Sequence, residues 1–290
     1  MIKVLLLVLM FPLAAQALTW EQYIAKKRTH VSHEKHLPFR LTHGHKTAHS
    51  VLLVHGIYSS PRYFKGMANA FYRAGYNVVT VLLPGHYDKD LQSINTTTNQ
   101  QWSAEVDQGY RFAQELGDKV ILAGHSLGGL LSMEQALKRP QSEITAVVMI
   151  SPALKVWPAV MAACHAGVAL GLSGNVFTPH RPDGIDIPYF GPIGGPLIQT
   201  LADRVLVRTP DVPVFMAYTW NDNVVDVPFL KKYFKRLKHP KQVRVYGLFS
   251  GVAHGDISQG PEDASTYGNK TNHDFDAMMD EALRFVEQQQ

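Results

Sequence analysis

The chain has 290 residues, 46% of which are apolar, and it carries a formal net charge of +4 at pH 7. This length and composition allow a sizeable core, organised as one domain with an insertion or as two small domains. A net charge this small gives no reason to expect nucleic acid as a partner.

The first residues have the layout of a secretory signal peptide. One lysine precedes a short apolar run that leads into Ala15-Gln16-Ala17. We therefore expect a signal peptide over residues 1–17, cleaved after Ala17, and a mature chain of residues 18–290. The alternative is a buried N-terminal helix. The apolar run is shorter than the roughly 20 residues that span a bilayer, and no later segment qualifies, so we expect no stable membrane insertion.

The number and position of cysteines bear on the cellular compartment that we expect for the protein. Cys164 is the single cysteine of the sequence. It can therefore form no intramolecular disulfide, and it lies too far from the cleavage site to serve as a lipid anchor. We expect an exported protein, periplasmic or secreted, that is not a lipoprotein and is stabilised by its core alone.

Apolar runs alternate with helical patterns along the mature chain. The runs are mostly continuous and β-branched, which is typical of strands buried on both faces of a parallel sheet. The expected strands cover residues 51–56, 77–83, 119–124, 146–151, 212–220 and 243–249. The expected helices cover residues 61–75, 102–116, 127–139, 226–238 and 273–288. The pattern predicts an α/β fold with a mostly parallel central sheet, helices on both faces, and the piece "PFRLTH" as an added edge strand.

One interval interrupts this alternation before the last two strands. From about residue 153 to 209 there is no strand pattern, and the apolar helical segment "VWPAVMAACHAGVALGLS" is followed by a stretch rich in proline and turn residues. A long interval of this kind inside a compact domain usually has a function, so we expect a cap insertion over the carboxyl edge of the sheet. The alternative is a separate helical subdomain without a gating role.

The densest basic run of the chain, "KKYFKRLKHPKQVR", covers residues 231–244. Its spacing fits the solvated outer face of an amphipathic helix. A weak contact with an anionic membrane surface is the alternative that stays open for this run.

A serine lies in the turn between a predicted strand and a predicted helix. The stretch Gly124-His125-Ser126-Leu127-Gly128 matches the pattern of a nucleophile elbow. The bend forces the serine into a cramped backbone conformation, and side chains at the two glycine positions would collide with the adjoining strand and helix. A serine in such a turn could also be no more than a helix N-cap. Whether the chain also supplies a base, an acid and oxyanion donors decides between the two interpretations.

A serine nucleophile needs a base, and the base needs an acid that holds it in one tautomer. Asp222 follows one predicted strand and His254 follows the last one, which completes the chain order nucleophile, acid, base that accompanies this elbow. Asp226 is a second candidate for the acid. Asp222 could also be only a helix cap, and His254 could be an ordinary loop histidine.

Two backbone amides are candidates for stabilising negative charge on a substrate oxygen. One is the N–H of Leu127, at the start of the elbow helix. The other is the N–H of Ile57, because Gly56 lets the chain turn after the first long strand. We interpret His55 and His125 as packing or hydrogen-bonding partners of these motifs and not as bases.

Five motifs follow one another along the chain: "HGIYSSPRYFKGMANAFYRAGYNVVTVLLPGH", "QWSAEVDQGYRFAQEL", "GHSLGG", "WNDNVV" and "VAHGD". Together they resemble the α/β-hydrolase superfamily, and more narrowly its carboxylesterase, monoacylglycerol lipase and lysophospholipase-like branch. The resemblance covers most of residues 50–255 and excludes the cap. It implies a catalytic triad of Ser126, Asp222 and His254, with Ile57 and Leu127 as the oxyanion hole.

The resemblance also bears on the type of reaction. Haloalkane dehalogenases and epoxide hydrolases of the superfamily have an aspartate at the elbow, so Ser126 implies acyl transfer. Tyr87 stands where the family often has a second glycine, a departure at the rim of the site. We expect no cofactor.

Three further residues are candidates for lining the substrate pocket. Tyr58 follows the first long strand, whereas Trp157 and Met161 lie in the apolar segment of the cap. An apolar cap favours a substrate with an acyl chain over a sugar or a peptide. Packing in the core would explain Tyr58 equally well.

Six of the 14 histidines lie between His30 and His49. His43 and His45 would share one face of an extended segment, so metal binding is an alternative. Zinc sites normally gather four ligands, and this region has no cysteine or neighbouring acidic pair to complete one. We therefore expect no metal site.

These observations predict an exported serine hydrolase that cleaves carboxylic esters through an acyl-enzyme, with a small-molecule or lipid ester as substrate. A thioesterase, an acyltransferase or a peptidase on the same triad stays open. The alternative of a different class is a non-catalytic binding protein that keeps the fold for recognition.

Overall fold

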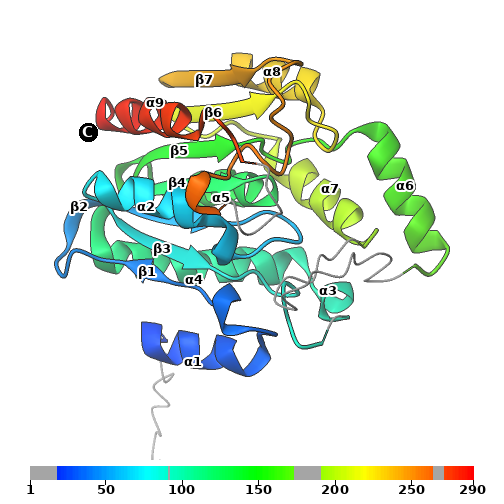
Figure 1. Ribbon diagram of the computed structural model, residues 1–290, viewed down its shortest axis with the longest axis horizontal. Helices are drawn as coiled ribbons and strands as arrows, with labels where there is room; N and C mark the ends of the chain where they lie inside the picture. The colour runs from blue at the N-terminus through cyan, green and yellow to red at the C-terminus, as the bar shows by residue number, and fades with distance from the viewer. Residues whose placement is uncertain (1–17, 91, 173–190, 264–270) are drawn as a thin grey trace, which may run out of the picture.

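The computed structural model describes residues 18–90, 92–172, 191–263 and 271–290 (Figure 1). The predicted signal peptide, residues 1–17, lies outside the described residues. Within those four ranges, no helix combines the length and the apolar character that crossing a lipid bilayer requires.

In the part of the chain that the structure describes, seven strands form one sheet in the order β1-β3-β2-β4-β5-β6-β7 (Figure 1). The strands are β1 Arg40–Leu41, β2 Thr47–Val54, β3 Asn77–Val81, β4 Gly117–His125, β5 Ile144–Ile150, β6 Val214–Thr219 and β7 Lys241–Tyr246. Only β1, at one edge, runs antiparallel to its neighbour. The predicted α/β fold and the predicted extra edge strand are confirmed.

Helices connect and flank these strands. They are α1 Trp20–His30, α2 Lys65–Arg73, α3 Ser93–Thr96, α4 Asn99–Leu116, α5 Leu127–Lys138, α6 Pro158–Ala169, α7 Gly194–Val205, α8 Val227–Arg236 and α9 Phe275–Glu287. The sequence patterns missed α1, whose buried residue is Tyr23 alone, so the helix has almost no apolar stripe. A capping box between Thr19 and Gln22 defines its start instead. Helix α4 begins earlier than predicted because Thr98 and Gln101 form the same motif there.

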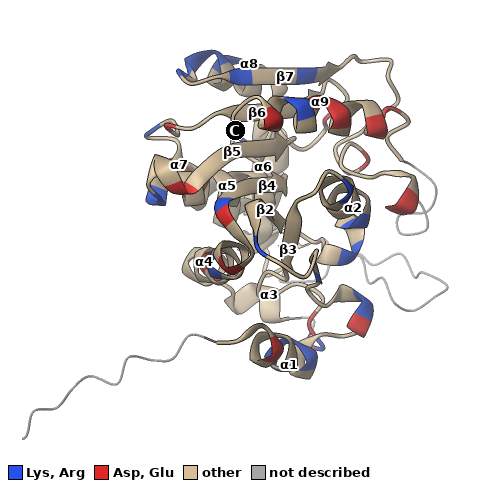
Figure 2. Cartoon of the chain, turned by 90° about the vertical axis from the view of Figure 1, so that its left-hand side faces the viewer, with Lys and Arg blue, Asp and Glu red and all other residues tan. Residues whose placement is uncertain are grey.

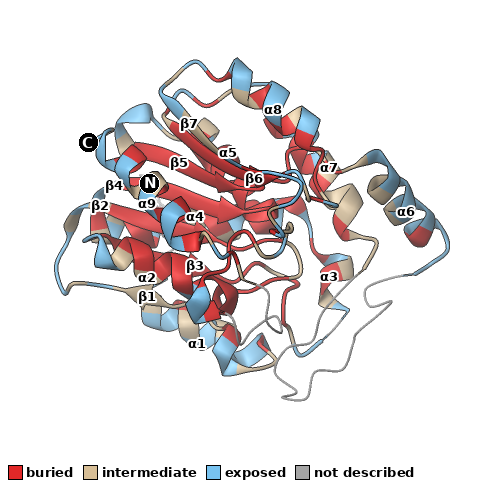
Figure 3. Cartoon of the chain, turned by 45° about the horizontal axis from the view of Figure 1, so that its top comes forward, coloured by how far each residue is buried: buried red, intermediate tan, exposed pale blue. Residues whose placement is uncertain are grey.

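The core has two layers, one on each face of the sheet. Neighbouring residues of β2 alternate between them, since Leu52 and Val54 belong to one hydrophobic cluster and Val51 and Leu53 to the other. The first cluster includes residues of α1, α4, α5, α7 and α8, and the second includes residues of α2 and α9. This burial of both faces explains why the strands read as continuous apolar runs. Figure 3 shows the central strands as buried over most of their length.

The two described helices of the predicted cap interval differ in their packing. Helix α6 is mostly exposed, and its buried residue is Gly167 (Figure 3). Helix α7 contributes Ile198 and Leu201 to the first hydrophobic cluster. Its Arg204 pairs with Glu134 of the elbow helix α5. Helix α7 is therefore anchored to the body of the domain, and α6 is the part that stands away from it.

The basic run of residues 231–244 covers the outer face of α8 and the edge strand β7 (Figure 2). Leu230 and Tyr233 are buried, whereas the lysines of the helix are exposed. The run is thus the polar face of an amphipathic helix, as its spacing predicts.

Candidate active site

Ser126 lies between the end of β4 and the start of α5, in a backbone conformation that non-glycine residues seldom adopt. Its φ is 53° and its ψ is −119°. Flanking backbone contacts hold it there, since its N–H donates to the carbonyl of Ile150 at 3.0 Å and its carbonyl accepts from the N–H of Ala153 at 2.9 Å. The strained turn is the geometry that a nucleophile elbow requires, and the surrounding structure maintains it.

The glycines of the elbow are required by backbone contacts. A Cβ added to Gly124 would lie 2.4 Å from the carbonyl carbon of Gly128, and one added to Gly128 would lie 2.0 Å from the carbonyl oxygen of Val54. Backbone atoms cannot move aside as the end of a flexible side chain can. The predicted collision with the adjoining strand and helix is therefore present at both positions.

Three side chains from distant parts of the chain form one line of hydrogen bonds. His254 Nε2 lies 3.0 Å from Ser126 Oγ, and His254 Nδ1 lies 2.6 Å from Asp222 Oδ2. The side chain of Asp222 is fully buried and that of His254 is 12% exposed. Ser126, at the other end of the line, is also buried. The structure brings together the three residues that the sequence singles out as nucleophile, base and acid.

The carboxylate of Asp222 uses its two oxygens differently. Oδ2 faces His254, while Oδ1 accepts from the N–H groups of Val224 at 2.9 Å and Val225 at 2.8 Å. Burial acts to raise the pKa of Asp222, but the facing His254 and the two N–H donors outweigh it, and the pKa is lowered. Asp222 is therefore ionised at neutral pH and oriented by its own loop.

Asp226, the second candidate for the acid, contacts other groups and not His254. Its Oδ1 accepts from the N–H of Phe229 and so caps helix α8, and its Oδ2 lies 3.2 Å from Lys155 Nζ. The geometry thus distinguishes the two aspartates. The carboxylate of Asp222 contacts His254, whereas that of Asp226 caps helix α8.

His125, the residue before the serine, contacts the loop that carries His254. Its Nε2 lies 2.8 Å from the backbone carbonyl of His254, so Nε2 carries the proton and donates it. Burial, followed by the proximity of His254, lowers the pKa of His125 to about 3. His125 stays neutral at neutral pH and acts as a hydrogen-bond donor, which agrees with its interpretation as a partner and not a base.

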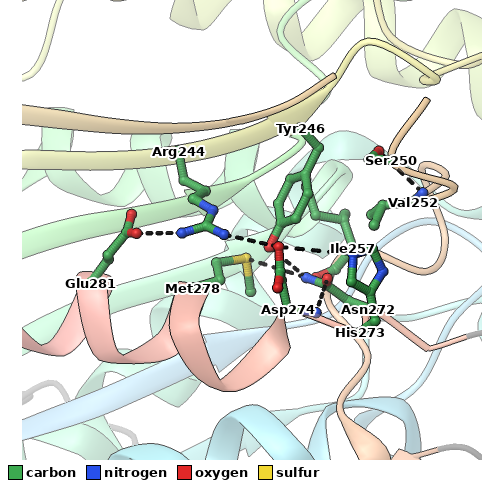
Figure 4. A network of polar contacts seen from close by, with 10 residues as sticks. All are labelled: Arg244, Tyr246, Ser250, Val252, Ile257, Asn272, His273, Asp274, Met278 and Glu281. Atoms are coloured by element: carbon green, nitrogen blue, oxygen red, sulfur yellow. Dashed lines mark hydrogen bonds and ion pairs between the residues drawn. The ribbon is translucent and has the colours of Figure 1, made fainter. Parts of the chain in front are cut away.

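Besides the contact with His125, further hydrogen bonds fix the loop that carries His254. Thr219 Oγ1 donates to the carbonyl of Val252 at 2.7 Å. The amide of Asn272 donates to the hydroxyl of Tyr246 at 2.8 Å and to the carbonyl of Ile257 at 3.1 Å (Figure 4). These bonds tie the histidine loop to the ends of β6 and β7 and to the segment before α9.

Arg244 of β7 continues this network along α9. It pairs with Asp274, at 3.1 Å between Nη2 and Oδ2, and with Glu281 (Figure 4). The network therefore links the last strand to the last helix beside the histidine loop.

The loop after β2 lies directly against the elbow. A Cβ added to Gly56 would be 3.2 Å from Ser126 Cβ and 3.2 Å from His125 Nδ1, so the chain passes within contact distance of the serine. Ile57 follows this glycine, and Leu127 is the first residue of α5, where a helix leaves its N–H groups without intrahelical partners. The two amides proposed for the oxyanion hole thus belong to segments that meet at Ser126.

His55 stabilises the turn into this loop. Its Nδ1 donates to the carbonyl of Gly56 at 2.8 Å, and its Nε2 accepts from the N–H of Leu83 at 3.0 Å. Burial and the nearby His86 lower the pKa of His55 well below its usual range. A neutral imidazole with one donor and one acceptor is what these two contacts require.

The candidates for lining the pocket have polar roles that the sequence did not indicate. The hydroxyl of Tyr58 donates to the carbonyl of Gly191 and accepts from the N–H of Gly194 at 3.3 Å, which ties the loop after β2 to the start of α7. The indole N–H of Trp157 donates to the backbone carbonyl of Asp222 at 3.0 Å. Met161 is half-buried and packs against the first hydrophobic cluster.

The N-terminal histidines have separate structural surroundings. His36 is buried, lies 2.8 Å from the hydroxyl of Ser60, and stacks on Tyr87, whose φ is 51°. His43 stacks on the ring of Tyr72. Within the ranges that the structure describes, no group of three or more histidine, cysteine or carboxylate side chains is arranged to hold a metal ion.

Comparison with known proteins agrees with this fold. The family described as Alpha/beta hydrolase family matches residues 51–283, so the chain belongs to the α/β-hydrolase family. A thermostable monoacylglycerol lipase of Bacillus sp. (strain H-257) is 32% identical over 117 residues, which are 40% of this chain and 45% of the relative. Phospholipase YtpA of Bacillus subtilis (strain 168) is 28% identical over 104 residues, 36% of this chain and 40% of the relative. The matches span less than half the length of both curated relatives.

Solved structures support the same fold. The monoacylglycerol lipase of Paleococcus ferrophilus has a TM-score of 0.64 at 20% identity and covers 87% of this chain and 99% of its own. A structure from a study of the metagenome-derived lipolytic enzymes LipS and LipT has a TM-score of 0.65 at 20% identity, with 87% and 97% covered. The resemblance to the lipase and esterase branch, inferred from the motifs, is confirmed.

Proposed function

We propose that this protein is an exported serine hydrolase that cleaves carboxylic esters of acyl chains through an acyl-enzyme. The observation that carries the proposal is the line of hydrogen bonds from Ser126 Oγ through His254 to Asp222, which starts on a strained elbow. A binding protein has no need of a nucleophile, a base and an acid in contact.

Each group has a defined part in the proposed reaction. His254 Nε2 takes the proton of Ser126 as Oγ attacks the ester carbonyl, and Asp222 holds the Nδ1–H so that Nε2 is free to accept. The N–H groups of Ile57 and Leu127 stabilise the negative oxygen of the tetrahedral intermediate.

The two products leave in separate steps. His254 returns the proton to the departing alcohol, which leaves an acyl-enzyme on Ser126. Water, deprotonated by the same imidazole, then attacks the acyl group and releases the carboxylic acid. The serine hydroxyl recovers its proton, so the protein is unchanged after each turnover.

The relatives guide the proposed substrate class. They are named as a monoacylglycerol lipase and a phospholipase. The apolar character of α6, which has no Lys, Arg, Asp or Glu along its length, fits an acyl chain better than a sugar or a peptide. We therefore propose a lipid ester, with Tyr58, Trp157 and Met161 near the acyl group.

Export is proposed from the sequence of residues 1–17, and the distance of Cys164 from the expected cleavage site argues against a lipid anchor. The mature protein would begin at Leu18 and act in the periplasm or outside the cell. Weak contact of α8 with an anionic membrane surface would fit such a location.

Hydrolysis of p-nitrophenyl esters from acetate to palmitate, together with a monoacylglycerol and a lysophospholipid, tests the proposed activity. The mature protein is expected to turn over these esters with a preference set by chain length, and Ser126→Ala should abolish the turnover. A folded wild type that hydrolyses none of them would exclude the esterase and favour a binding protein. Faster release from thioesters, or transfer to an added alcohol in place of water, would favour a thioesterase or an acyltransferase.

A further inference from the structure

We propose that Trp157 is a positioning residue for the acid of the triad, and that it ties helix α6 to Asp222. The inference rests on the proposed function, since it assigns the way in which the catalytic carboxylate is held. It makes the start of the cap a structural part of the active site and not only a cover over it.

A short strap precedes α6 and runs antiparallel to the loop that carries Asp222. Val156 and Val225 pair as an isolated antiparallel bridge. The backbone N–H of Trp157 donates to the carbonyl of Val224 at 3.0 Å. The N–H of Asp226 donates in turn to the carbonyl of Lys155 at 2.8 Å. The strap, residues 155–157, thus forms a small two-stranded ribbon with the acid loop.

Two side chains of the strap reinforce this ribbon at its ends. Lys155 Nζ lies 3.2 Å from Asp226 Oδ2, where the loop passes into α8. At the other end the indole N–H of Trp157 donates to the backbone carbonyl of Asp222 at 3.0 Å. The second contact reaches the residue whose side chain faces His254.

The contact between Trp157 and the backbone of Asp222 lies where it would control the orientation of the Asp222 carboxylate. Asp222 Oδ1 accepts from the N–H groups of Val224 and Val225, so the carboxylate is oriented by the backbone of its own loop. Trp157 holds the same loop at the carbonyls of Asp222 and Val224. Loosening it would turn the carboxylate relative to the imidazole of His254 and weaken the 2.6 Å contact between Asp222 Oδ2 and His254 Nδ1.

The cap follows the strap without a linker. Helix α6 begins at Pro158, and the N–H of Met161 bonds to the carbonyl of Trp157 at 3.0 Å in its first turn. Val160 and Met161 pack against the first hydrophobic cluster, and the rest of α6 is mostly exposed. A displacement of this helix would act on these contacts and, through the adjoining strap, on Trp157. An acyl chain bound under α6 would therefore influence the orientation of Asp222.

The test replaces Trp157 by Phe, which keeps an aromatic ring and removes the N–H donor. Trp220→Phe is the matched control, since Trp220 lies two residues before Asp222 and its side chain is 37% exposed. We expect Trp157→Phe to lower kcat about tenfold, the value of one hydrogen bond, with KM changed less than about twofold. Trp220→Phe should leave kcat unchanged.

A second readout does not depend on turnover. The proton between His254 Nδ1 and Asp222 Oδ2 should give a strongly deshielded resonance in the proton NMR spectrum, absent in Asp222→Asn. We expect Trp157→Phe to shift or broaden this resonance, whereas Trp220→Phe should not change it. The resonance keeps the two proposals separate, because it reports the position of Asp222 even if the wild type cleaves no ester.

Several outcomes would overturn the inference. They are an unchanged resonance and kcat in Trp157→Phe, or an effect confined to KM, which would make Trp157 only part of the pocket wall. If Trp157→Phe does not fold, Lys155→Met loosens the same strap at its exposed end. It should then lower kcat by a smaller factor and move the resonance in the same direction, and no change in either would equally refute the proposal.

Discussion

The imidazole of His125 holds the backbone of His254, with 2.8 Å between Nε2 of the first and the carbonyl oxygen of the second. Their rings lie 4.8 Å apart. The residue before Ser126 thus fixes the loop that carries His254, so the turn at residues 125–126 positions both partners of the proposed proton transfer.

Replacing His125 by Phe should lower kcat. The ring volume is retained but the donor to His254 is lost, so the base would sample positions away from Ser126. We expect a loss of about tenfold in kcat/KM, equivalent to one hydrogen bond of about 1.4 kcal/mol. Steady-state kinetics on a short-chain ester measure it. His125→Gln, which restores a donor, should recover part of the loss, and an equal loss in both variants would argue against this role.

The two candidate acids predict different kinetic results. In Asp222→Asn the amide can donate toward His254 Nδ1 and so favours the wrong tautomer, and kcat should fall by at least about 1,000-fold. In Asp226→Asn the helix cap is kept, since Asn caps helices as well as Asp does, and kcat should change only a few-fold. Parallel kinetics of both variants measure the difference. The assignment of the acid would be reversed if Asp226→Asn were the more damaging change.

Gly128→Ala should destabilise the fold, because the new methyl group would lie 2.0 Å from the carbonyl oxygen of Val54. We expect the free energy of unfolding to fall by about 3 kcal/mol or more. Gly247→Ala is the control, since an added Cβ at Gly247 meets nothing within 4 Å. Urea unfolding monitored by circular dichroism compares the variants. Similar midpoints for both would show that the elbow can accept a side chain.

Asp263 should make stability depend on pH below neutrality. Burial raises its pKa to about 6, against an ordinary value of 3.8, even though the N–H groups of Gly260 and Gly66 donate to it. The folded state therefore binds the proton more tightly than the unfolded state does. Stability from this group is full below pH 4, falls as pH rises through about 6, and is constant above, with a total loss of about 3 kcal/mol.

Melting temperatures of wild type and Asp263→Asn between pH 4 and pH 7 test this dependence. The variant cannot titrate at this position, so the wild type should lose stability relative to it across that interval. Glu262→Gln is a control at the neighbouring position, where hydrogen bonds from Asn69 and Arg73 lower the pKa. A constant difference between wild type and Asp263→Asn would contradict the assignment.

The fold and the centre of the site were predictable from local signals. The strands of a parallel sheet are buried on both faces, so their apolar runs appear directly in the sequence. The elbow needs glycine at two fixed offsets from Ser126, and parallel strands bring their carboxyl ends to one edge. Chain order and strand position were therefore enough to predict that Asp222 and His254 lie beside Ser126.

The contacts that hold the site residues in place left no such signal in the sequence. The bond from Trp157 to Asp222 joins residues 65 positions apart, and its acceptor is a backbone carbonyl, which every residue has. The two N–H donors to Asp222 likewise carry no side-chain signature. A stretch such as "NDNVV" is compatible with a helix cap, and only the three-dimensional position of His254 shows which aspartate faces the base.

Helix α1 was missed for a different reason. Trp20 and Tyr23 pack against Phe112 and Ile24 is half-buried, but most other residues of the helix are polar and exposed, so its apolar pattern is too short to indicate a helix. Its polar contacts with the body, such as the ion pair between Lys27 and Glu105, are long-range. The capping box at Thr19 was the one local signal that could have indicated it.

Covalent labelling tests most directly whether Ser126 is the nucleophile. Wild-type protein and Ser126→Ala are incubated with a fluorophosphonate, and the modified peptide is identified by mass spectrometry. We expect one adduct per wild-type chain, on Ser126, and none in the variant. A folded wild type that takes up no label, or a variant that is labelled as fast as the wild type, would contradict the assignment of Ser126 as an activated nucleophile.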